Sequence, residues 1–369
     1  DWSVTGVQTC ALPICMIIAA HNEEDVIIKK LENALSLNYP NTHFEVIVAS
    51  DGSDVATNDL VAKYVSPEVQ LLRLPRLGKN RSVNAAVAAA SGDILVFTDA
   101  DSMLTPDSLR HLVSPFADPQ VGGVAGDYRY VTDVEGGHAE RTYWGVDRIL
   151  KQQQSYGGSI TSASGQLYAL RREIFKEVPM TVSDDIFTSI QVPAAHKRLV
   201  FEPLAVAYGP VAGNILSEFQ RKVRILTRSM SSMMNMSILL NPRKYGFYAL
   251  QIMSHKVLRW MMFVPLIILF FVSPLLWNES IIYQLATVSQ FSFYSAAIIA
   301  YLGRNTRLAR IKPLSLPLFF VMVNLAALIA FVNFVRGKTY HVWTAQRAES
   351  EQLKEMVLSD TAKVAIPEN

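Results

Sequence analysis

Residues 91–102, SGDILVFTDADS, decide the fold of this chain. A turn at Gly92 leads into the apolar run 94–97, which is rich in β-branched and aromatic side chains. Such a run is typical of a strand buried on both faces of a parallel sheet. It ends at Asp99 and Asp101, two carboxylates that are costly to bury unless a cation meets them. Oxygen ligands of this kind suit Mg²⁺ or Mn²⁺ shared with a phosphate, and the alternative is a solvated strand end.

Apolar strands alternate with helical patterns on the N-terminal side of this stretch. The patterns predict strands at 15–20, 44–49 and 69–74 and helices at 25–37, 58–64 and 78–90. This order predicts an α/β domain with a mostly parallel sheet and crossover helices. Ligands bind such sheets outside the carboxyl ends of the strands, and residues 21–23, Asp51 and the Asp99/Asp101 pair all follow such ends. They therefore mark a candidate site.

The pattern is looser after residue 105. It predicts a strand over 121–131, with antiparallel pairing as one option, a polar helix at 136–154, a turn and strand within 162–172, and a last strand at 198–207. Ser183 stands at the N-cap position of a helix that opens with Asp184 and Asp185.

The composition separates a globular part from an apolar one. The chain has 369 residues, of which 18% are charged, and roughly the first 240 suffice for one large single-core domain. The net charge of +2 argues neither for nor against nucleic acid, and we expect no such partner. Cys10 and Cys15 lie at the N-terminus, so no disulfide framework is implied, which fits a reducing cytosolic face.

Residues 1–14, DWSVTGVQTCALPI, resemble the conceptual translation of a sequencing-adapter oligonucleotide. We therefore exclude them from fold reasoning. The alternative is a short native N-terminal extension.

Three apolar stretches, 257–277, 281–302 and 313–335, are each long enough to cross a bilayer core, which needs about 20 residues. The alternative is buried core helices. The loop between the last two contains Arg304, Arg307, Arg310 and Lys312, and the positive-inside rule places it, and hence the N-terminal domain, in the cytoplasm. If all three stretches cross the membrane, the polar tail 336–369 lies outside the cytoplasm. The basic residues at the start of this tail conflict with that side. The Ser/Gln-rich middle stretch is the best candidate for a re-entrant segment.

A basic stretch at 219–228 and the Met-rich segment 229–256 precede these spans. Their order suits an amphipathic segment at the membrane interface, and Trp260 is expected at headgroup level.

Seven motifs, AAHNEE, SDGS, GKNRSVNAA, TDADS, SGQLYALRR, SDD and QRKVR, occur in an order that resembles family 2 glycosyltransferases of the membrane-bound polysaccharide-synthase type. The resemblance covers about residues 15–345. It implies a GT-A fold over 15–228, the fold of nucleotide-diphospho-sugar transferases. It also implies inverting transfer from a nucleotide diphosphate sugar, usually UDP-linked, to a growing polysaccharide or a lipid-linked acceptor at the cytoplasmic membrane.

The same resemblance implies roles for donor-side residues. Asp101, and less directly Asp99, would hold the Mg²⁺ or Mn²⁺ ion, because charge develops on the leaving diphosphate. The nucleotide would contact Ala20, Asn22, Glu23 and Asp51, with Lys79 near the nucleotide or its phosphates. A solvated helix lysine is the alternative for Lys79.

On the acceptor side, Asp185 of the Asp184-Asp185 pair would remove the acceptor proton, and Gly165 would line the acceptor site. Helix-dipole compensation is the alternative for the pair.

Two motifs depart from the family pattern. The QxxRW motif appears as RKVRI at 221–225, which leaves Arg221 and Arg224 as diphosphate contacts and weakens the case for processive synthesis. In the DGSTD-like motif Asp54 has an uncertain role. Two alternatives therefore stay open: transfer of a single sugar to a lipid carrier, and a catalytically idle membrane subunit that binds nucleotide or an assembly partner.

Overall fold

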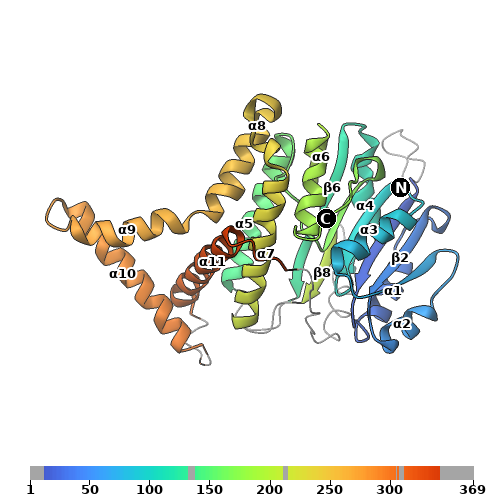
Figure 1. Cartoon of the computed structure of the whole chain (residues 1–369), viewed down its shortest axis with the longest axis horizontal. Coiled ribbons are helices and arrows are strands. Elements are labelled where there is room, and N and C mark those ends of the chain that lie inside the picture. Colours follow the sequence, from blue (N-terminus) through green and yellow to red (C-terminus); the bar gives the residue numbers. More distant parts are fainter. Residues whose placement is uncertain (1–11, 132–137, 211–214, 305, 307–310, 341–369) are drawn as a thin grey trace, which may run out of the picture.

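The computed structural model describes residues 12–131, 138–210, 215–304, 306 and 311–340. An eight-stranded sheet with the strand order β3-β2-β1-β4-β7-β6-β8-β5 forms the centre of the N-terminal domain (Figure 1). The strands are β1 (Ile14–Ala20), β2 (Phe44–Asp51), β3 (Val69–Leu74), β4 (Ile94–Asp99), β5 (Met103–Leu104), β6 (Val121–Val131), β7 (Leu167–Arg171) and β8 (Arg198–Pro210). The four strands β1 to β4 are parallel, β7 pairs antiparallel with β4 and β6, and β6 pairs parallel with β8. The mostly parallel α/β sheet predicted from the sequence is confirmed.

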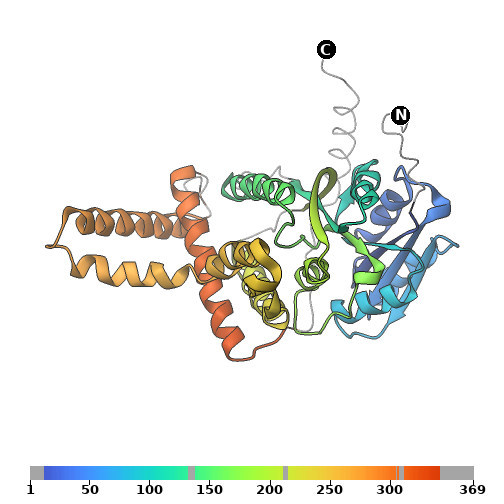
Figure 2. The same ribbon diagram turned by 90° about the horizontal axis from the view of Figure 1, so that it is seen from above.

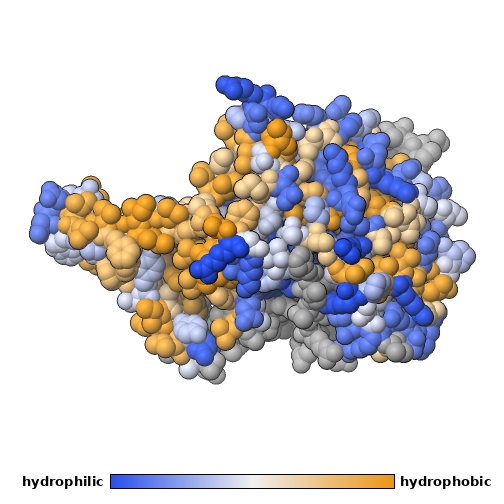
Figure 3. Space-filling model, in the orientation of Figure 1, coloured by the Kyte–Doolittle hydropathy of each residue, from blue (hydrophilic) through white to orange (hydrophobic). Residues whose placement is uncertain are grey.

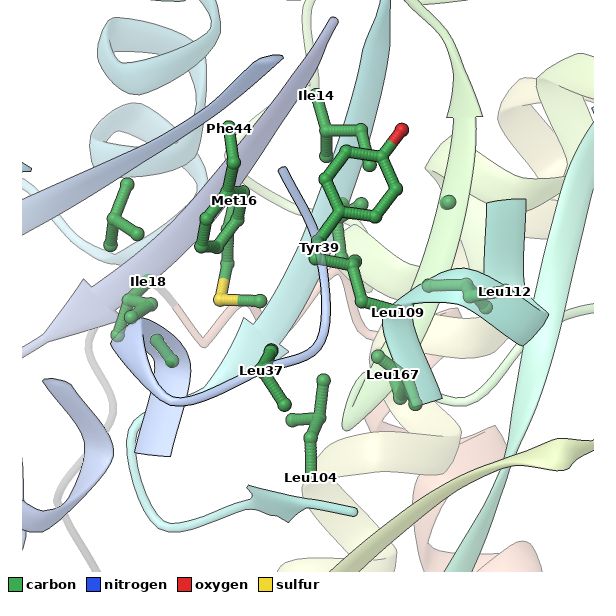
Figure 4. Packing of buried hydrophobic residues seen from close by; sticks show 14 of the residues in the cluster. Ile14, Met16, Ile18, Leu37, Tyr39, Phe44, Leu104, Leu109, Leu112 and Leu167 are labelled. Atoms are coloured by element: carbon green, nitrogen blue, oxygen red, sulfur yellow. The ribbon is translucent and has the colours of Figure 1, made fainter. Parts of the chain in front are cut away.

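Helices cover both faces of the sheet. The helices of the domain are α1 (Ile27–Leu35), α2 (Val55–Ala62), α3 (Lys79–Ala89), α4 (Ser108–Val113), α5 (His138–Tyr156) and α6 (Asp184–Ala194). Every residue of β1 is buried, and alternate side chains enter two separate cores. Met16 belongs to the same buried cluster as Leu109 and Leu112 (Figure 4), whereas Ile17 belongs to the other cluster, with Val83 of α3. The side chains of β4 likewise alternate between the two cores, as its uninterrupted apolar run predicts.

The boundaries differ from the sequence prediction in a few places. α2 begins at Val55 rather than at residue 58, and β8 continues to Pro210. β1 begins at Ile14, inside the segment that we set aside as foreign, and Ile14 pairs with Phe44 and with Ile94. The hydroxyl of Tyr39 also donates to the carbonyl of Leu12, so the described part of that segment takes part in the fold.

The C-terminal helices project from one side of this domain (Figures 1 and 2). They are α7 (Ile215–Asn235), α8 (Pro242–Ile252), the π-helical turn η6 (Met253–Leu258), α9 (Phe263–Leu275), α10 (Ile281–Leu302) and α11 (Lys312–Val335). α9 and α10 form a hairpin whose surface is largely hydrophobic in Figure 3, and α11 returns to pack along α7.

Two of these helices, Ile281–Leu302 and Pro313–Val335, are long and apolar enough to cross a membrane. The first expected span, 257–277, is not one straight helix: Pro242–Leu258 and Phe263–Leu275 are bent by 55° at a short break. Pro265 explains the break, because it lacks the N–H that would donate to the carbonyl of Met261. Trp260, expected at headgroup level, is instead buried in a cluster with Met230 and Ala330.

Arg228 connects α7 to α3 and to the segment before α6. Its side chain is buried and donates to the carbonyl of Val182 at 2.9 Å and to Asn80 Oδ1 at 2.7 Å. The Asn80 amide in turn donates to the carbonyl of Val182 at 3.0 Å. One buried guanidinium therefore joins α7, α3 and the segment before α6.

We predict that Arg228→Met lowers the free energy of unfolding by about 2–4 kcal/mol, because it leaves the buried Asn80 Oδ1 without its donor and removes two hydrogen bonds to the Val182 carbonyl. Thermal unfolding of the detergent-solubilised chain would measure the change. Arg243→Met, at an exposed position of α8, is the matched control and should change stability by less than about 0.5 kcal/mol. Equal melting temperatures for the two variants would contradict this account.

Candidate active site

The carboxyl ends of β1, β2 and β4 meet at one edge of the sheet. Ala20 pairs with Ser50 and Ala19 pairs with Asp99, so these three strands end at the same level. The structure therefore brings together the loops that carry residues 21–23, Asp51 and the Asp99/Asp101 pair, which the sequence placed at strand ends.

Asp51 is fully buried and anchors the loop before α3. Its carboxylate accepts from the backbone N–H groups of Leu77 at 2.7 Å and Gly78 at 2.9 Å, and from Arg76 Nη1 at 2.8 Å. Glycine suits position 78 because the φ of +95° there lies where other residues are strained. Asp51 thus fixes the start of α3, and a direct contact with the nucleotide stays a prediction.

Asn22 ties the loop after β1 to the loop after β2. Its side-chain Oδ1 accepts from the backbone N–H of Asp54 at 2.9 Å, and its own N–H donates to Ser53 Oγ at 3.2 Å. Its φ of +54° is one that Asn tolerates better than most residues. The neighbouring Glu23 N–H donates to Thr57 Oγ1 at 3.1 Å. These contacts turn the chain so that Glu23 faces the strand-end carboxylates.

Three carboxylates repel one another at this edge. Burial, with Asp99 next, raises the pKa of Asp101 to about 6. Burial, followed by Asp101 and Asp99, raises the pKa of Glu23 to about 8. Each shift means that the ionised form is unfavourable without a further cation. The group is therefore suited to receive one.

Lys79 joins the strand end to the acidic pair of α6. Its Nζ lies 2.7 Å from Asp99 Oδ1 and 3.1 Å from Asp184 Oδ2. Burial alone would lower the pKa of Lys79, but Asp184 and Asp99 outweigh it and hold the pKa well above its ordinary value. Lys79 is thus a two-carboxylate bridge and not the solvated helix lysine of the alternative interpretation.

Asp184 and Asp185 differ in their surroundings. Lys79, then Arg228, lower the pKa of Asp184 despite its burial, whereas burial and the neighbouring Asp184 raise the pKa of Asp185. Asp185 Oδ1 accepts from Ser183 Oγ at 2.6 Å and from the Ile186 N–H at 2.8 Å. Ser183 occupies the predicted N-cap position, but its hydroxyl orients Asp185 instead of capping the helix.

Gly165 lies against the other oxygen of Asp185. A β-carbon built at Gly165 would lie 3.5 Å from Asp185 Oδ2. Gly165 has only a hydrogen where other residues have a side chain. It therefore leaves space beside this oxygen of Asp185.

The turn after β4 is held by two residues of α1, Lys30 and Asn33. Neither was predicted from the sequence. The ammonium of Lys30 is fully buried and donates to Thr98 Oγ1 at 2.9 Å and to the carbonyl of Ser102. Burial lowers the pKa of Lys30 to about 7, although Asp101 and Asp99 oppose this change. The Asn33 amide exchanges two 2.8 Å hydrogen bonds with Leu104. The sequence signal that could have identified Lys30 is its position on the apolar stripe of α1.

Arg224 and Arg221 have different electrostatic partners. Burial, with Arg228 and Arg221, lowers the pKa of Arg224, while Asp184 opposes the change. Arg221 Nε instead donates to Glu218 Oε2 at 2.7 Å within α7. A contact of either arginine with a diphosphate stays a prediction.

The donor set fits a divalent ion that the substrate helps to bind. Among the described residues, no three or more His, Cys, Asp and Glu side chains converge as a metal site. Asp99 and Asp101 alone can supply one or two carboxylates, which is the usual protein share for Mg²⁺ when phosphates complete the coordination. The raised pKa of Asp101 is the observation that favours such a cation.

The chain is similar in sequence to known glycosyltransferases. The model of the family "Glycosyl transferase family 2" matches residues 15–179. The chain is similar to poly-beta-1,6-N-acetyl-D-glucosamine synthase of Staphylococcus aureus, with 25% identity over 224 residues, or 57% of this chain and 53% of that protein. It is also similar to the probable glycosyltransferase YdaM of Bacillus subtilis, with 27% identity over 215 residues, or 53% of this chain and 50% of that protein. The chain thus spans about half the length of the curated relatives it matches.

A solved structure shares the fold. The mannosyltransferase PcManGT from Pyrobaculum calidifontis, in complex with GDP-Man and Mn²⁺, superposes with a TM-score of 0.62 and 21% identity over 89% of each chain. The predicted family and the GT-A-like sheet followed by long apolar helices are both confirmed.

We predict that Asp101→Asn stabilises the metal-free protein at pH 7.5 by on the order of 1–3 kcal/mol. Because the pKa of Asp101 is raised from 3.8 to about 6, wild-type stability falls as pH rises through that window, and the variant avoids this loss. The advantage should vanish below pH 4. Melting temperatures in EDTA across this pH range test it.

Asp107→Asn, at an exposed carboxylate, is the control and should change stability little at any pH. Mn²⁺ with a nucleoside diphosphate should raise the melting temperature of the wild type but not of Asp101→Asn. A lower melting temperature for metal-free Asp101→Asn at pH 7.5 would refute the charge-repulsion account.

Proposed function

We propose that this chain, whose residues 15–179 belong to glycosyltransferase family 2, transfers a sugar from a nucleotide diphosphate sugar to a polysaccharide or lipid-linked acceptor. The observation that carries the proposal is the Lys79 bridge, which joins Asp99 to Asp184 next to Asp185. A donor site and an acceptor base are useful only when they are adjacent. This bridge supports that adjacency.

The donor would lie over the ends of β1, β2 and β4. Its nucleoside would contact the loops that hold Ala20, Asn22 and Glu23, with Asp51 supporting the loop before α3. Mg²⁺ or Mn²⁺ bound by Asp101 and Asp99 would supply positive charge against the charge that develops on the leaving diphosphate. UDP is the nucleotide we propose.

Lys79 and Arg224 are the protein cations that would contact the diphosphate in this proposal. Lys79 is held between Asp99 and Asp184, so its ammonium is already oriented before donor binds. Arg221 would act through its ion pair with Glu218, which stiffens the same face of α7.

Asp185 would act as the general base of an inverting displacement. The acceptor oxygen forms a bond to the anomeric carbon as the bond from that carbon to the diphosphate oxygen breaks. The electron pair leaves with the nucleoside diphosphate, and the acceptor proton passes to Asp185. The raised pKa of Asp185 suits a base, and Ser183 and Ile186 hold one oxygen while the other lies beside Gly165.

One observation favours transfer of a single sugar to a lipid carrier as a second candidate. Ile225 stands where processive members of the family have Trp, and Trp260 is packed against Ala330 of α11. Neither residue supplies an aromatic platform for a growing glycan. The length of the product made by purified protein would separate a polymer from a single-sugar lipid.

We further propose that residues 15–228 form the catalytic domain on the cytoplasmic face, that 229–256 lie at the membrane interface and that 257–335 form the membrane region. The 228/229 boundary lies inside α7, so the interfacial segment continues a catalytic-domain helix. Arg304 and Lys312 belong to the loop whose charge supports this sidedness, and Arg307 and Arg310 lie outside the described residues.

We predict that Asp185→Asn lowers kcat for transfer by at least about a hundredfold, because the acceptor proton loses its base. Nucleotide binding should change less than about threefold. Release of UDP from UDP-glucose, UDP-N-acetylglucosamine and UDP-galactose, with Mn²⁺ and membrane acceptors, measures the loss. Asp118→Asn on the far side of the domain is the control. Undiminished turnover by Asp185→Asn would reject the base, and no release by wild type from any donor would favour the idle-subunit alternative.

We predict that Gly165→Ala folds normally but raises the apparent KM for acceptor about tenfold. The added methyl group meets Asp185 at ordinary van der Waals distance, so it fits while covering the exposed side of the carboxylate. Initial rates at varied acceptor, with donor hydrolysis measured in parallel, separate the two effects. Gly145→Ala, where nothing lies within 4 Å of the new β-carbon, is the control. A matching rise in the KM for donor would place Gly165 elsewhere.

A further inference from the structure

The most apolar helix of the chain, α11, lies alongside α7 of the catalytic domain. Near the start of α11, the ring centroid of Phe319 lies 5.3 Å from Lys222 Nζ. Near its end, Ala330 belongs to the same buried cluster as Met233. Eleven residues separate the two positions in each helix, so the helices run side by side in the same direction for about three turns.

This packing conflicts with a membrane crossing by α11. The stretch from Phe319 to Ala330 is the middle of α11, which in a spanning helix would lie in the hydrocarbon core. The part of α7 beside it carries Lys222, Arg224 and Arg228, and charged side chains are costly in that core. Arg228 also donates to Asn80, so a crossing by α11 would draw α3 toward lipid as well. We therefore expect α11 to stay outside the core.

The α9/α10 hairpin, by contrast, has the surface of a membrane-embedded unit. Apolar side chains are exposed on it, among them Phe271 and Leu285. Its polar groups meet between the two helices: Thr287 Oγ1 donates to Ser273 Oγ at 3.3 Å, and the Gln290 amide donates to the same hydroxyl oxygen. Polar groups paired between helices, with apolar groups outside, are what lipid requires.

The length and the tip of the hairpin suit a crossing. α10 has 22 residues, which is about 33 Å against a core of about 30 Å. α9 is shorter, with 13 residues, and a bilayer accommodates such a mismatch by local thinning. The tip carries Trp277, which is typical of the interface, and Glu279, whose charge is costly in the core. The tip therefore belongs at the far headgroups.

α11 runs across the base of the hairpin and not along it (Figure 2). Small residues, Ala326 and Ala330, are buried on it, whereas Leu325, Ile329 and Val332 are exposed. A helix with one side on the protein and exposed apolar side chains elsewhere matches the boundary between headgroups and acyl chains.

The basic residues at the two ends of α11 agree with that position. Arg304 precedes α11, and Arg336 and Lys338 follow it, all exposed. If α11 crossed the bilayer, one of these basic groups would lie outside the cytoplasm, against the positive-inside rule. With α11 along the membrane surface, both groups lie on the same side.

We infer that α9 and α10 cross the bilayer as one hairpin, and that α11 lies along the membrane surface between the bilayer and the catalytic domain. Both ends of α11 are then on the side of the catalytic domain, and the lipid headgroup region is the partner of its exposed apolar face. The cluster that contains Ala330 also contains Ile186, the residue after Asp185, so the candidate base is held near headgroup level. This arrangement is independent of the proposed activity, and only the names of the two sides depend on the proposed sidedness.

The first test locates four positions relative to the bilayer with single cysteines in the full chain. Cys10→Ser removes one native thiol, and Cys15 is buried, so this parent should stay unlabelled. The added cysteines are Thr42→Cys on the catalytic domain, Glu279→Cys at the hairpin tip, Thr306→Cys before α11 and Thr339→Cys after it. Each variant is treated with a membrane-impermeant maleimide in intact spheroplasts and in inverted inner-membrane vesicles of a bacterial host.

We expect Thr42→Cys, Thr306→Cys and Thr339→Cys to be labelled only in inverted vesicles, and Glu279→Cys only in spheroplasts. Labelling of Thr339→Cys on the side opposite Thr42→Cys would overturn the inference, because α11 would then cross. Labelling of Glu279→Cys on the side of Thr42→Cys would overturn the hairpin crossing. If Thr42→Cys is labelled in spheroplasts and the two positions around α11 follow it, the proposed sidedness is wrong and the position of α11 is supported.

The second test compares depth in the membrane. Leu325 and Phe291 lie near the middle of α11 and α10, and their side chains are exposed to nearly the same fraction, 47% and 46%. Leu325→Cys and Phe291→Cys are therefore a matched pair for a nitroxide spin label in nanodiscs. The accessibility of the label to oxygen, which concentrates in the bilayer centre, and to a water-soluble nickel chelate reports its depth.

We expect the label at Leu325→Cys to have the higher ratio of chelate to oxygen accessibility, because a surface helix lies at a shallower depth than the middle of a spanning one. The label at Thr42→Cys gives the aqueous limit of this ratio. Equal ratios for the α11 and α10 labels, in variants that keep the melting temperature of the parent, would overturn the inference.

Discussion

The ion pair of Lys79 with Asp99 and Asp184 is the interaction on which the candidate site depends. Asp99 ends β4 and Asp184 opens α6, and these residues are far apart in the chain. Their approach brings together like charges, which costs free energy in a buried setting unless a cation lies between them. Lys79 is able to do so because Gly78 adopts a positive φ that starts α3 at the required place, and Asp51 binds that turn through two backbone N–H groups. The series from Asp51 through Gly78 to Lys79 is thus a structural explanation for the SDGS and GKN motifs.

Local patterns were sufficient for the parallel strands β1 to β4, but not for β5 or for the pairing of β6 with β7 and β8. β3 begins and ends where its apolar run does, and β4 is buried on both faces because its run has no polar alternation. The bridge by Lys79 was not predictable, because nothing local distinguishes a lysine at a helix start that contacts two distant carboxylates from a solvated one. The roles of Lys30 and Arg228 were not predicted, for a related reason. Each is a charged residue on the inner side of a helix, and its partners come from other elements.

The apolar helices show a different limit of sequence reasoning. Hydropathy is a sum over composition, so it located α10 and α11 within a residue of their observed bounds. It did not resolve the break in the first stretch, because one missing N–H at Pro265 changes the direction of a helix without changing its hydropathy. Trp260 is buried for the same geometric reason: α11 packs back on α7 and covers it, and composition says nothing of that return.

Two lysines near the strand ends differ in their partners, and the partners separate their roles. Lys30 is fully buried, and its ammonium donates to the hydroxyl of Thr98 and the carbonyl of Ser102, so it shapes the acidic turn from inside. Lys79 lies level with the carboxylates and balances them across two elements. Since a buried cation cannot leave its partners without a large desolvation cost, Lys30 and Lys79 are fixed parts of the site before a donor binds.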